Sequence, residues 1–279
     1  MGAEPRAVGR RIGYAALPAF VRTWVDARYG PVTVLRDHVG GMSPGCATSL
    51  RTGAGETIFV KAVGAELNAQ TVELFRAELR LQRILRPAPY RPALLGGLDR
   101  DGWVAIVLQH VDGRFPDLSD VADLAAVAAA IDAQVAELTP VPAGVDVLPL
   151  AETARRWLAR WADVAADPSR YLPGWAAARC DALLSRLRTL PGRLPPTTLC
   201  HFDVRDDNVL IRSDGSAALL DWGMARLGPP WTDRVLLAAQ QSTSAADRLL
   251  QRWFPPADRA DRVDRADRVD RVDRVDRVD

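Results

Sequence analysis

Residues 32–62 alternate short runs of apolar and β-branched residues with glycine-rich turns. The runs VTVLRDHV, ATSLRT and TIFVKAV are separated by GGMSPG and GAGE. Runs of this kind, bounded by glycine clusters, are typical of strands that tight turns connect. The pattern therefore predicts a meander of three strands.

From Glu66 to Leu85 the apolar residues recur mostly at spacings of three and four, which is the period of a helix. Pro87 follows and ends this run, because proline cannot continue a helix. The segments ALLGGL and WVAIVLQHV then flank turn residues 99–102 and predict a hairpin. The first part of the chain thus contains three predicted strands, a helix and two more strands.

Beyond Gly113 the pattern is mainly helical. We predict helices over residues 118–138, 151–165, 175–190 and 231–254, with a proline-containing connection at 139–149. NVLIR and AALLD flank residues 213–216 and predict a short hairpin among these helices. Trp157, Trp161 and Trp175 are expected in the helical core.

Residues 258–279 repeat Asp-Arg-Val or Asp-Arg-Ala with period three. On a helix each period-three step rotates the valine position by about 60°, so no apolar stripe forms. Asp–Arg pairs could stabilise a solvated helix by roughly 0.2–0.5 kcal/mol each. Because no hydrophobic burial would offset the entropy of ordering, we expect a disordered tail or a lone helix.

Composition and charge exclude several classes of function. The chain has 279 residues, 48% of them hydrophobic, and its 36 basic and 35 acidic residues leave a net charge of +1. Such a balance provides no field that would hold nucleic acid or an anionic membrane. We find neither a signal-like apolar stretch in residues 1–20 nor a long apolar run, and the three cysteines lack metal-ligand spacing. We expect a cytoplasmic protein without membrane or nucleic-acid partners, and the sequence leaves the oligomeric state open.

Two clusters, HFDVRDDN at 201–208 and DWG at 221–223, flank the predicted short hairpin. Phosphoryl transfer needs a carboxylate that orients and deprotonates the attacking hydroxyl, and oxygen ligands that hold Mg²⁺ against the nucleotide phosphates. An Asp five residues before an Asn is, taken alone, more often turn capping. In this order, Asp203 is the candidate base, and Asn208 and Asp221 are the candidate metal ligands.

In these clusters the chain resembles the kinase-like small-molecule phosphotransferases, namely the aminoglycoside phosphotransferase family with its choline and homoserine kinase relatives. The resemblance covers roughly residues 30–254. His201 matches the family's catalytic-loop histidine, and Asp233 matches the acidic residue that follows the metal-binding segment. No long activation loop follows DWG, which disfavours a protein kinase.

The resemblance implies an α+β fold of the protein-kinase-like, bilobal type, with an N-terminal antiparallel sheet plus helix and a mainly helical C-terminal lobe. The expected organisation is an N-terminal segment 1–29, a nucleotide-binding lobe 30–113, a catalytic and acceptor-binding lobe 114–257 and the tail 258–279.

Lys61 is the only lysine of the chain and falls in FVKAV on the third predicted strand. Kinases carry at this place the lysine that neutralises the α and β phosphates. Its expected partner is an acidic residue of the following helix, and Glu78 matches the family's position better than Glu73.

Further nucleotide contacts are implied by the resemblance. The segment GGMSPG at 40–45, with Gly40, Gly41 and Ser43, would cover the phosphates through its backbone amides, although it lacks the full GxGxxG spacing. In LQHVDG, backbone groups of Gln109 and Val111 would meet the adenine edge.

The implied function is transfer of the γ-phosphate of ATP or GTP, with Mg²⁺, to a hydroxyl of a small molecule, either an aminoglycoside-type antibiotic or an amino alcohol. Acidic residues that could bind a polycationic acceptor are balanced by Arg205 and other arginines; these residues are Asp163, Asp167, Asp206 and Asp207. The alternative is a weak or inactive nucleotide-binding remnant, because only residues 234–257 separate Asp233 from the repeat.

Overall fold

The computed structural model of the chain describes residues 10–41, 43–241, 246, 249–250 and 252–253. These residues fall into two compact units, one that ends at Asp233 and one that begins at Arg234. The lobe boundary expected after Gly113 lies inside the first unit and stays a prediction. The repeat at 258–279 lies outside the described residues.

The first unit contains a five-stranded antiparallel sheet. Its strands are β1 (Thr33–Asp37), β2 (Cys46–Arg51), β3 (Thr57–Gly64), β4 (Leu94–Arg100) and β5 (Trp103–Gln109). Their order is β1-β2-β3-β5-β4, and helix α2 (Ala65–Ile84) connects β3 to β4. The predicted succession of three strands, one helix and two strands is confirmed.

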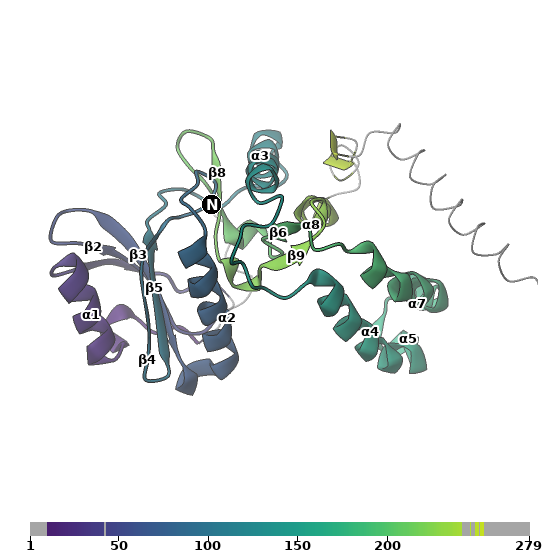
Figure 1. Ribbon diagram of the computed structural model, residues 1–279, viewed down its shortest axis with the longest axis horizontal. Helices are drawn as coiled ribbons and strands as arrows, with labels where there is room; N and C mark the ends of the chain where they lie inside the picture. Colours follow the sequence, from purple (N-terminus) through teal and green to yellow (C-terminus); the bar gives the residue numbers. More distant parts are fainter. Residues whose placement is uncertain (1–9, 42, 242–245, 247–248, 251, 254–279) are drawn as a thin grey trace, which may run out of the picture. The chain divides into compact units, whose positions relative to one another are not determined.

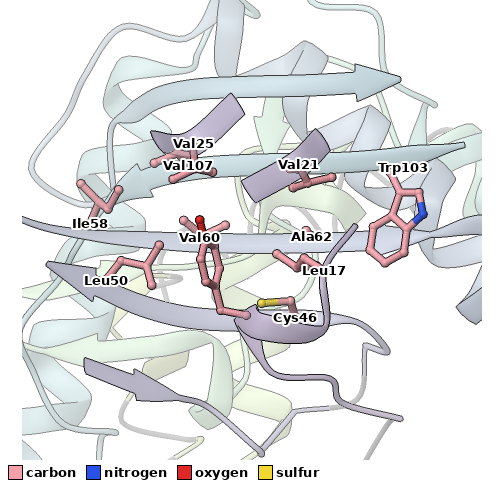
Figure 2. Close-up of a cluster of buried hydrophobic side chains, with 12 residues drawn as sticks. Leu17, Val21, Val25, Cys46, Leu50, Ile58, Val60, Ala62, Trp103 and Val107 are labelled. Carbon is pink, nitrogen blue, oxygen red and sulfur yellow. The ribbon is translucent and has the colours of Figure 1, made fainter. Parts of the chain in front are cut away.

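Side chains of β3 alternate between two hydrophobic clusters. Ile58, Val60 and Ala62 pack with helix α1 (Ala19–Tyr29) on one face of the sheet, as Figure 2 shows. Val63 packs with α2 on the other face. Because successive side chains of a strand point to opposite faces, Lys61 lies on the face that α2 covers.

Helix α1 corrects the sequence analysis, which assigned no helix to residues 1–29. A short 3-10 turn, Tyr14–Ala16, precedes α1. Val21 and Val25, one helical turn apart, are fully buried against the sheet. Figure 1 shows α1 and α2 on opposite sides of the strands. A sheet whose central strands are apolar on both faces needs such cover on both sides.

The rest of the first unit is largely helical. Its helices are α3 (Val121–Glu137), α4 (Leu150–Ala166), α5 (Pro168–Tyr171), α6 (Gly174–Ala177) and α7 (Cys180–Thr189), followed by a 3-10 turn, Leu190–Arg193. The helix predicted over 175–190 is interrupted between α6 and α7. The last predicted helix, 231–254, is likewise not continuous: α8 (Thr232–Ala239) ends before a turn at residues 240–241, and the described residues 246, 249–250 and 252–253 are helical again.

Two short strand pairs flank the segments that carry the candidate catalytic and metal-binding residues. Strands β7 (Val209–Ile211) and β8 (Ala217–Leu219) form the predicted hairpin. Strands β6 (Thr198–Cys200) and β9 (Arg226–Gly228) form a second antiparallel pair that the sequence analysis missed. The loop 201–208 therefore connects β6 to β7, and residues 220–225 connect β8 to β9.

The tryptophans expected in the helical core are more exposed than predicted. Trp157 and Trp175 are 45% and 67% exposed, and Trp161 is half-buried. Helix α4 is buried only near its beginning, at Leu150 and Ala154, so its second half has little cover from the described residues. Within the described ranges, no helix combines the length and the apolar character needed to span a membrane.

Candidate active site

Asp203 and Asn208, five residues apart, contact each other. The Asn208 side-chain Nδ2 donates to Asp203 Oδ2 at 2.8 Å and to the Asp203 carbonyl at 3.0 Å. A 3-10 turn over Asp206–Asn208 brings the two residues together. Both hydrogen bonds use the amide nitrogen, and among the described residues no donor bonds to the Asn208 Oδ1 atom.

The carboxylate of Asp203 is half-buried. Burial raises the pKa of Asp203 above its ordinary value, and the charge of Asp221 adds to this increase, whereas Arg205 and His201 oppose it. The Arg205 Nη1 atom lies 3.6 Å from Asp203 Oδ1. Asp203 therefore has the cation of Arg205 close to its carboxylate, and the carboxylate of Asp221 is near enough to influence its pKa.

His201 fixes the backbone of the same loop. Its Nε2 lies 2.7 Å from the Leu220 carbonyl, and its Nδ1 accepts the backbone N–H of Asp203 at 3.3 Å. A carbonyl can only accept, so Nε2 is the donor and the ring is in one defined tautomer. The buried ring also meets the indole of Trp222 edge to face, with 4.9 Å between centroids.

The Asp233 carboxylate holds the backbone at the beginning of this loop through hydrogen bonds. Its Oδ2 accepts the backbone N–H of His201 at 2.7 Å and the side-chain amide of Gln134 at 2.7 Å. Its Oδ1 accepts the backbone N–H of Phe202 at 2.8 Å. Phe202 has a positive φ of 66°, which a non-glycine residue adopts only when its surroundings hold it there.

Gln134 was missed by the sequence analysis. It is fully buried on α3 and also donates to the Leu199 carbonyl at 3.1 Å. The only signal for it in the sequence is a polar residue within the apolar helical run AAAIDAQVAE.

Lys61 joins the sheet to the segment after β8. Its Nζ forms an ion pair with the carboxylate of Glu78 on α2 and lies 3.1 Å from Asp221 Oδ1. The same ammonium lies 4.6 Å from the centre of the Phe75 ring. Glu73, the other acidic residue considered, is exposed and pairs with Arg76 at 2.7 Å.

Burial and charge act in opposite directions within this group. Burial raises the pKa of Glu78 to about 7, although the Lys61 ammonium opposes the increase. For Lys61, burial favours the neutral form, but Asp221 and Glu78 outweigh it and raise its pKa. For Asp221, burial is likewise outweighed, here by Lys61, which lowers its pKa. Lys61 and Asp221 are thus a charged pair, whereas the pKa of Glu78 lies close to neutral pH.

The DWG segment holds Asp221 in a left-handed backbone conformation, with φ of 61°. Trp222 is 1% exposed and donates its indole N–H to the Leu219 carbonyl at 3.2 Å. At Gly223, a Cβ atom would lie 3.0 Å from the Leu74 carbonyl of α2. The buried indole and the close backbone contact together fix where the Asp221 carboxylate lies.

The segment 40–45, hereafter the glycine loop, connects β1 to β2. Gly41 and Gly45 have positive φ values of 98° and 107°, and Gly40 and Ser43 are half-buried. The sequence analysis did not foresee that Arg11 contacts this loop, donating from its guanidinium to the Gly40 carbonyl. The loop's predicted place next to a nucleotide stays a prediction.

The two residues expected to meet an adenine lie where the sheet ends. Gln109 is the last residue of β5, and its backbone N–H donates to the Ala93 carbonyl at 2.9 Å. Val111 is half-buried in the irregular segment that follows. The structure thus brings Asp203 to Asn208 and Lys61 to Glu78 and Asp221. The place of Gln109 and Val111 beside an adenine stays a prediction.

Comparison with known proteins shows the family and the fold of the chain. The family model APH, described as the phosphotransferase enzyme family, matches residues 47–266. No curated protein sequence matches the chain.

Several solved structures share the fold. Choline kinase LicA from Streptococcus pneumoniae is 14% identical with a TM-score of 0.56, over 83% of this chain and 78% of its own. The macrolide 2'-phosphotransferase MphH from Brachybacterium faecium is 18% identical with a TM-score of 0.54, over 84% and 81%. The ADP-bound aminoglycoside phosphotransferase APH(2'')-Ib is 14% identical with a TM-score of 0.54, over 88% and 84%. The expected α+β, kinase-like fold is therefore confirmed.

Proposed function

Because the chain belongs to the phosphotransferase enzyme family, we propose that it transfers the γ-phosphate of ATP or GTP to a hydroxyl group of a small molecule. The observation that carries this proposal is the contact of Asp221, in the DWG segment, with Lys61 on the sheet, where Lys61 Nζ lies 3.1 Å from Asp221 Oδ1. This contact joins a candidate metal ligand to the candidate phosphate-binding lysine. The charge of Asp221 also contributes to the raised pKa of Asp203 in the loop after β6.

On the nucleotide side, Lys61 would bind the α and β phosphates, with Glu78 holding its ammonium in place. Asn208 Oδ1 and the Asp221 carboxylate would hold Mg²⁺, which prefers such hard oxygen ligands. The donor set fits this ion, because Asn208 directs its nitrogen to Asp203 and keeps its oxygen free of described donors. When bound, Mg²⁺ would neutralise charge on the transferred phosphoryl group.

Asp203 would accept the proton of the acceptor hydroxyl as the oxygen attacks the phosphorus. Asn208 orients its carboxylate, and His201 and Asp233 fix the backbone before it. A pKa raised by burial brings a carboxylate closer to neutral pH, where a general base works best. Each of these residues therefore has a distinct task in a hydroxyl-directed reaction.

The surroundings of Asp203 support an acceptor with few positive charges. Arg205 binds Asp207 through two hydrogen bonds of 2.9 and 3.0 Å, so this carboxylate is already neutralised. The Phe202 ring stacks on the exposed Trp157 with 6.1 Å between centroids, and the Arg226 guanidinium lies 5.8 Å from it. The guanidinium groups of Arg205 and Arg226 repel further positive charge, so these surroundings favour an acceptor with few positive charges over a polycation.

Three free cysteines, Cys46, Cys180 and Cys200, are buried and form no disulfide within the described residues, which supports our proposal of a cytoplasmic location.

Asp203→Asn distinguishes this function from the nucleotide-binding remnant. The substitution keeps size and most hydrogen bonds, so Mg-ATP binding should survive, whereas turnover should fall by about 10² to 10⁴ with loss of the general base. We would measure nucleotide titration together with ATP consumption over a panel of hydroxyl compounds and without acceptor.

Asp214→Asn, at an exposed position in the turn between β7 and β8, is the control and should keep its turnover. Comparable rates for wild type and Asp203→Asn would refute the assigned base. Nucleotide binding by wild type without turnover of any compound or of water would favour the remnant.

A further inference from the structure

Arg11 contacts both ends of the glycine loop. Its guanidinium donates to the Gly40 carbonyl from Nε at 3.0 Å and from Nη2 at 2.7 Å. Its backbone forms a parallel bridge with Gly45, in which Gly45 donates to the Arg10 carbonyl at 3.0 Å and Ile12 donates to the Gly45 carbonyl at 3.1 Å. A single parallel bridge thus ties the backbone at Arg11 to the end of the loop.

The geometry also explains one glycine of the loop. A Cβ atom at Gly41 would overlap Nη2 of Arg11, and the φ of 98° at this residue is itself unfavourable for other side chains. Gly41 therefore leaves room for the guanidinium directly beneath the loop.

The guanidinium of Arg11 has no counter-ion in the described part of the chain. The side chain is half-buried, and no carboxylate lies within 4.0 Å of it there. A guanidinium has five N–H groups, and the Gly40 carbonyl is the only described acceptor for them. A cation that is partly withdrawn from water without an anion is less well stabilised than an exposed one, so such a group is suited to an anion that arrives later.

The guanidinium also lies within electrostatic reach of the candidate metal-binding segment. Burial lowers the pKa of Arg11, and the carboxylate of Asp221 is the strongest influence that raises it. Asp221 itself is engaged by Lys61 at 3.1 Å. Lys61 on β3 and Arg11 beneath the glycine loop are therefore two cations that share the field of one carboxylate.

We propose that Arg11 is a second cationic residue of the nucleotide site, which binds the terminal phosphates while it holds the glycine loop over them. The proposal rests on the proposed function, because it needs a nucleotide between Lys61 and the loop. The planar guanidinium can bind two phosphate oxygens at once, whereas the ammonium of Lys61 acts as a point charge. Arg11 would thus add directed hydrogen bonds to the phosphates next to a glycine loop that lacks the full GxGxxG spacing.

Titration of the full chain with Mg-ATP, Mg-ADP, AMP and adenosine tests this role. For Arg11→Gln we expect Kd to rise about tenfold or more for Mg-ATP, as for loss of a hydrogen bond to a charged group. The increase should shrink along the series and be under about twofold for adenosine, which has no phosphate. Arg10→Gln is the matched control, since it removes an exposed charge one residue away, and it should change no Kd more than about twofold.

The outcomes separate this proposal from the function it rests on. If wild type binds neither Mg-ATP nor, in a parallel titration, Mg-GTP, both are wrong. If wild type binds Mg-ATP and Arg11→Gln binds it equally well, only the role of Arg11 is wrong. An equal loss for Mg-ATP and adenosine would show that Arg11 only supports the loop.

Arg11→Lys guards against a folding defect. Lysine keeps the positive charge but lacks the planar N–H groups of the guanidinium, so this variant should recover part of the Mg-ATP affinity. If both variants lose the thermal transition of wild type, Arg11 is a structural residue and the proposal is overturned.

Discussion

At the scale of single residues, the balance of charge around Lys61 is the most informative feature. The ammonium lies between Glu78 and Asp221, two carboxylates from elements far apart in the sequence. Position in the family pattern was enough to favour Glu78 over Glu73. The pattern could not reveal that Glu78 is fully buried, because burial depends on α2 packing against the segment after β8.

Glu78 should make the stability of the nucleotide-free protein depend on pH. Its folded pKa of about 7 lies above its ordinary 4.5, so the folded state binds this proton more tightly than the unfolded chain. Its contribution to stability is therefore fully present below its ordinary pKa and is lost as the pH rises through its folded pKa. Lys61 and Asp221, the charged groups that face Glu78, have pKa values shifted away from this window.

Urea denaturation at several pH values would check this. Glu78→Gln should flatten the decrease in unfolding free energy between about pH 5 and 8. The exposed Glu73→Gln should leave it unchanged. A constant difference between wild type and Glu78→Gln over this range would mean that Glu78 does not titrate there.

At the scale of elements, apolar runs bounded by glycine-rich turns, together with helical spacing, predicted most of the fold. β2, β3 and β5 each have six or more residues, so their apolar pattern stands out. β6 and β9 have three residues each, too few to show a period, and their pairing depends on tertiary contacts. Helix α1 lacks the usual start signals, since Pro18 precedes it without a side-chain cap and its first turn has no acidic residue.

The junction between the glycine loop and β2 offers a sharp test of element packing. Gly45 has a φ of 107°, and a Cβ atom there would collide with the Ala62 carbonyl of β3. Gly55, in the turn between β2 and β3, has a φ of 86° but nothing within 4 Å of its Cβ position. Both alanine variants have the unfavourable φ, and only Gly45→Ala adds a backbone clash.

We expect Gly55→Ala to lower the unfolding free energy by about 1 kcal/mol. Gly45→Ala should cost about 2 kcal/mol more, because β2 and β3 must separate locally. Denaturant midpoints with unchanged slopes would measure both effects. Equal losses for the two variants would show that β3 yields to the added methyl group.

At the scale of the whole molecule, the candidate site is assembled from segments that the sequence keeps far apart. Lys61 and Asp221 are 160 residues apart and meet through one hydrogen bond. The sequence motifs alone identify these two residues, since each has a chemical task that few residue types perform. Arg11 and Gln134 could not be found in this way, because arginine is common throughout this chain and a single buried glutamine follows no pattern.

The repeat at 258–279 is expected to add little to the fold, although it lies outside the described residues. Its valines cannot line one face of a helix, so it has no apolar stripe to bury. A chain that ends at Ala257 should melt within a few degrees of the full chain, as calorimetry would measure. A much lower Tm, or slow amide exchange throughout the repeat, would show that it packs against the protein.

The Asp233 carboxylate also has a consequence for the order of folding during synthesis. It accepts the backbone N–H groups of His201 and Phe202, which precede it by 32 and 31 residues. A ribosome therefore releases the whole loop before the residue that fixes its first turn has emerged. The left-handed turn at Phe202 lacks this partner until Asp233 has emerged, so we expect the loop 201–208 to take its final conformation late, when the sheet and α3 are already available to support it.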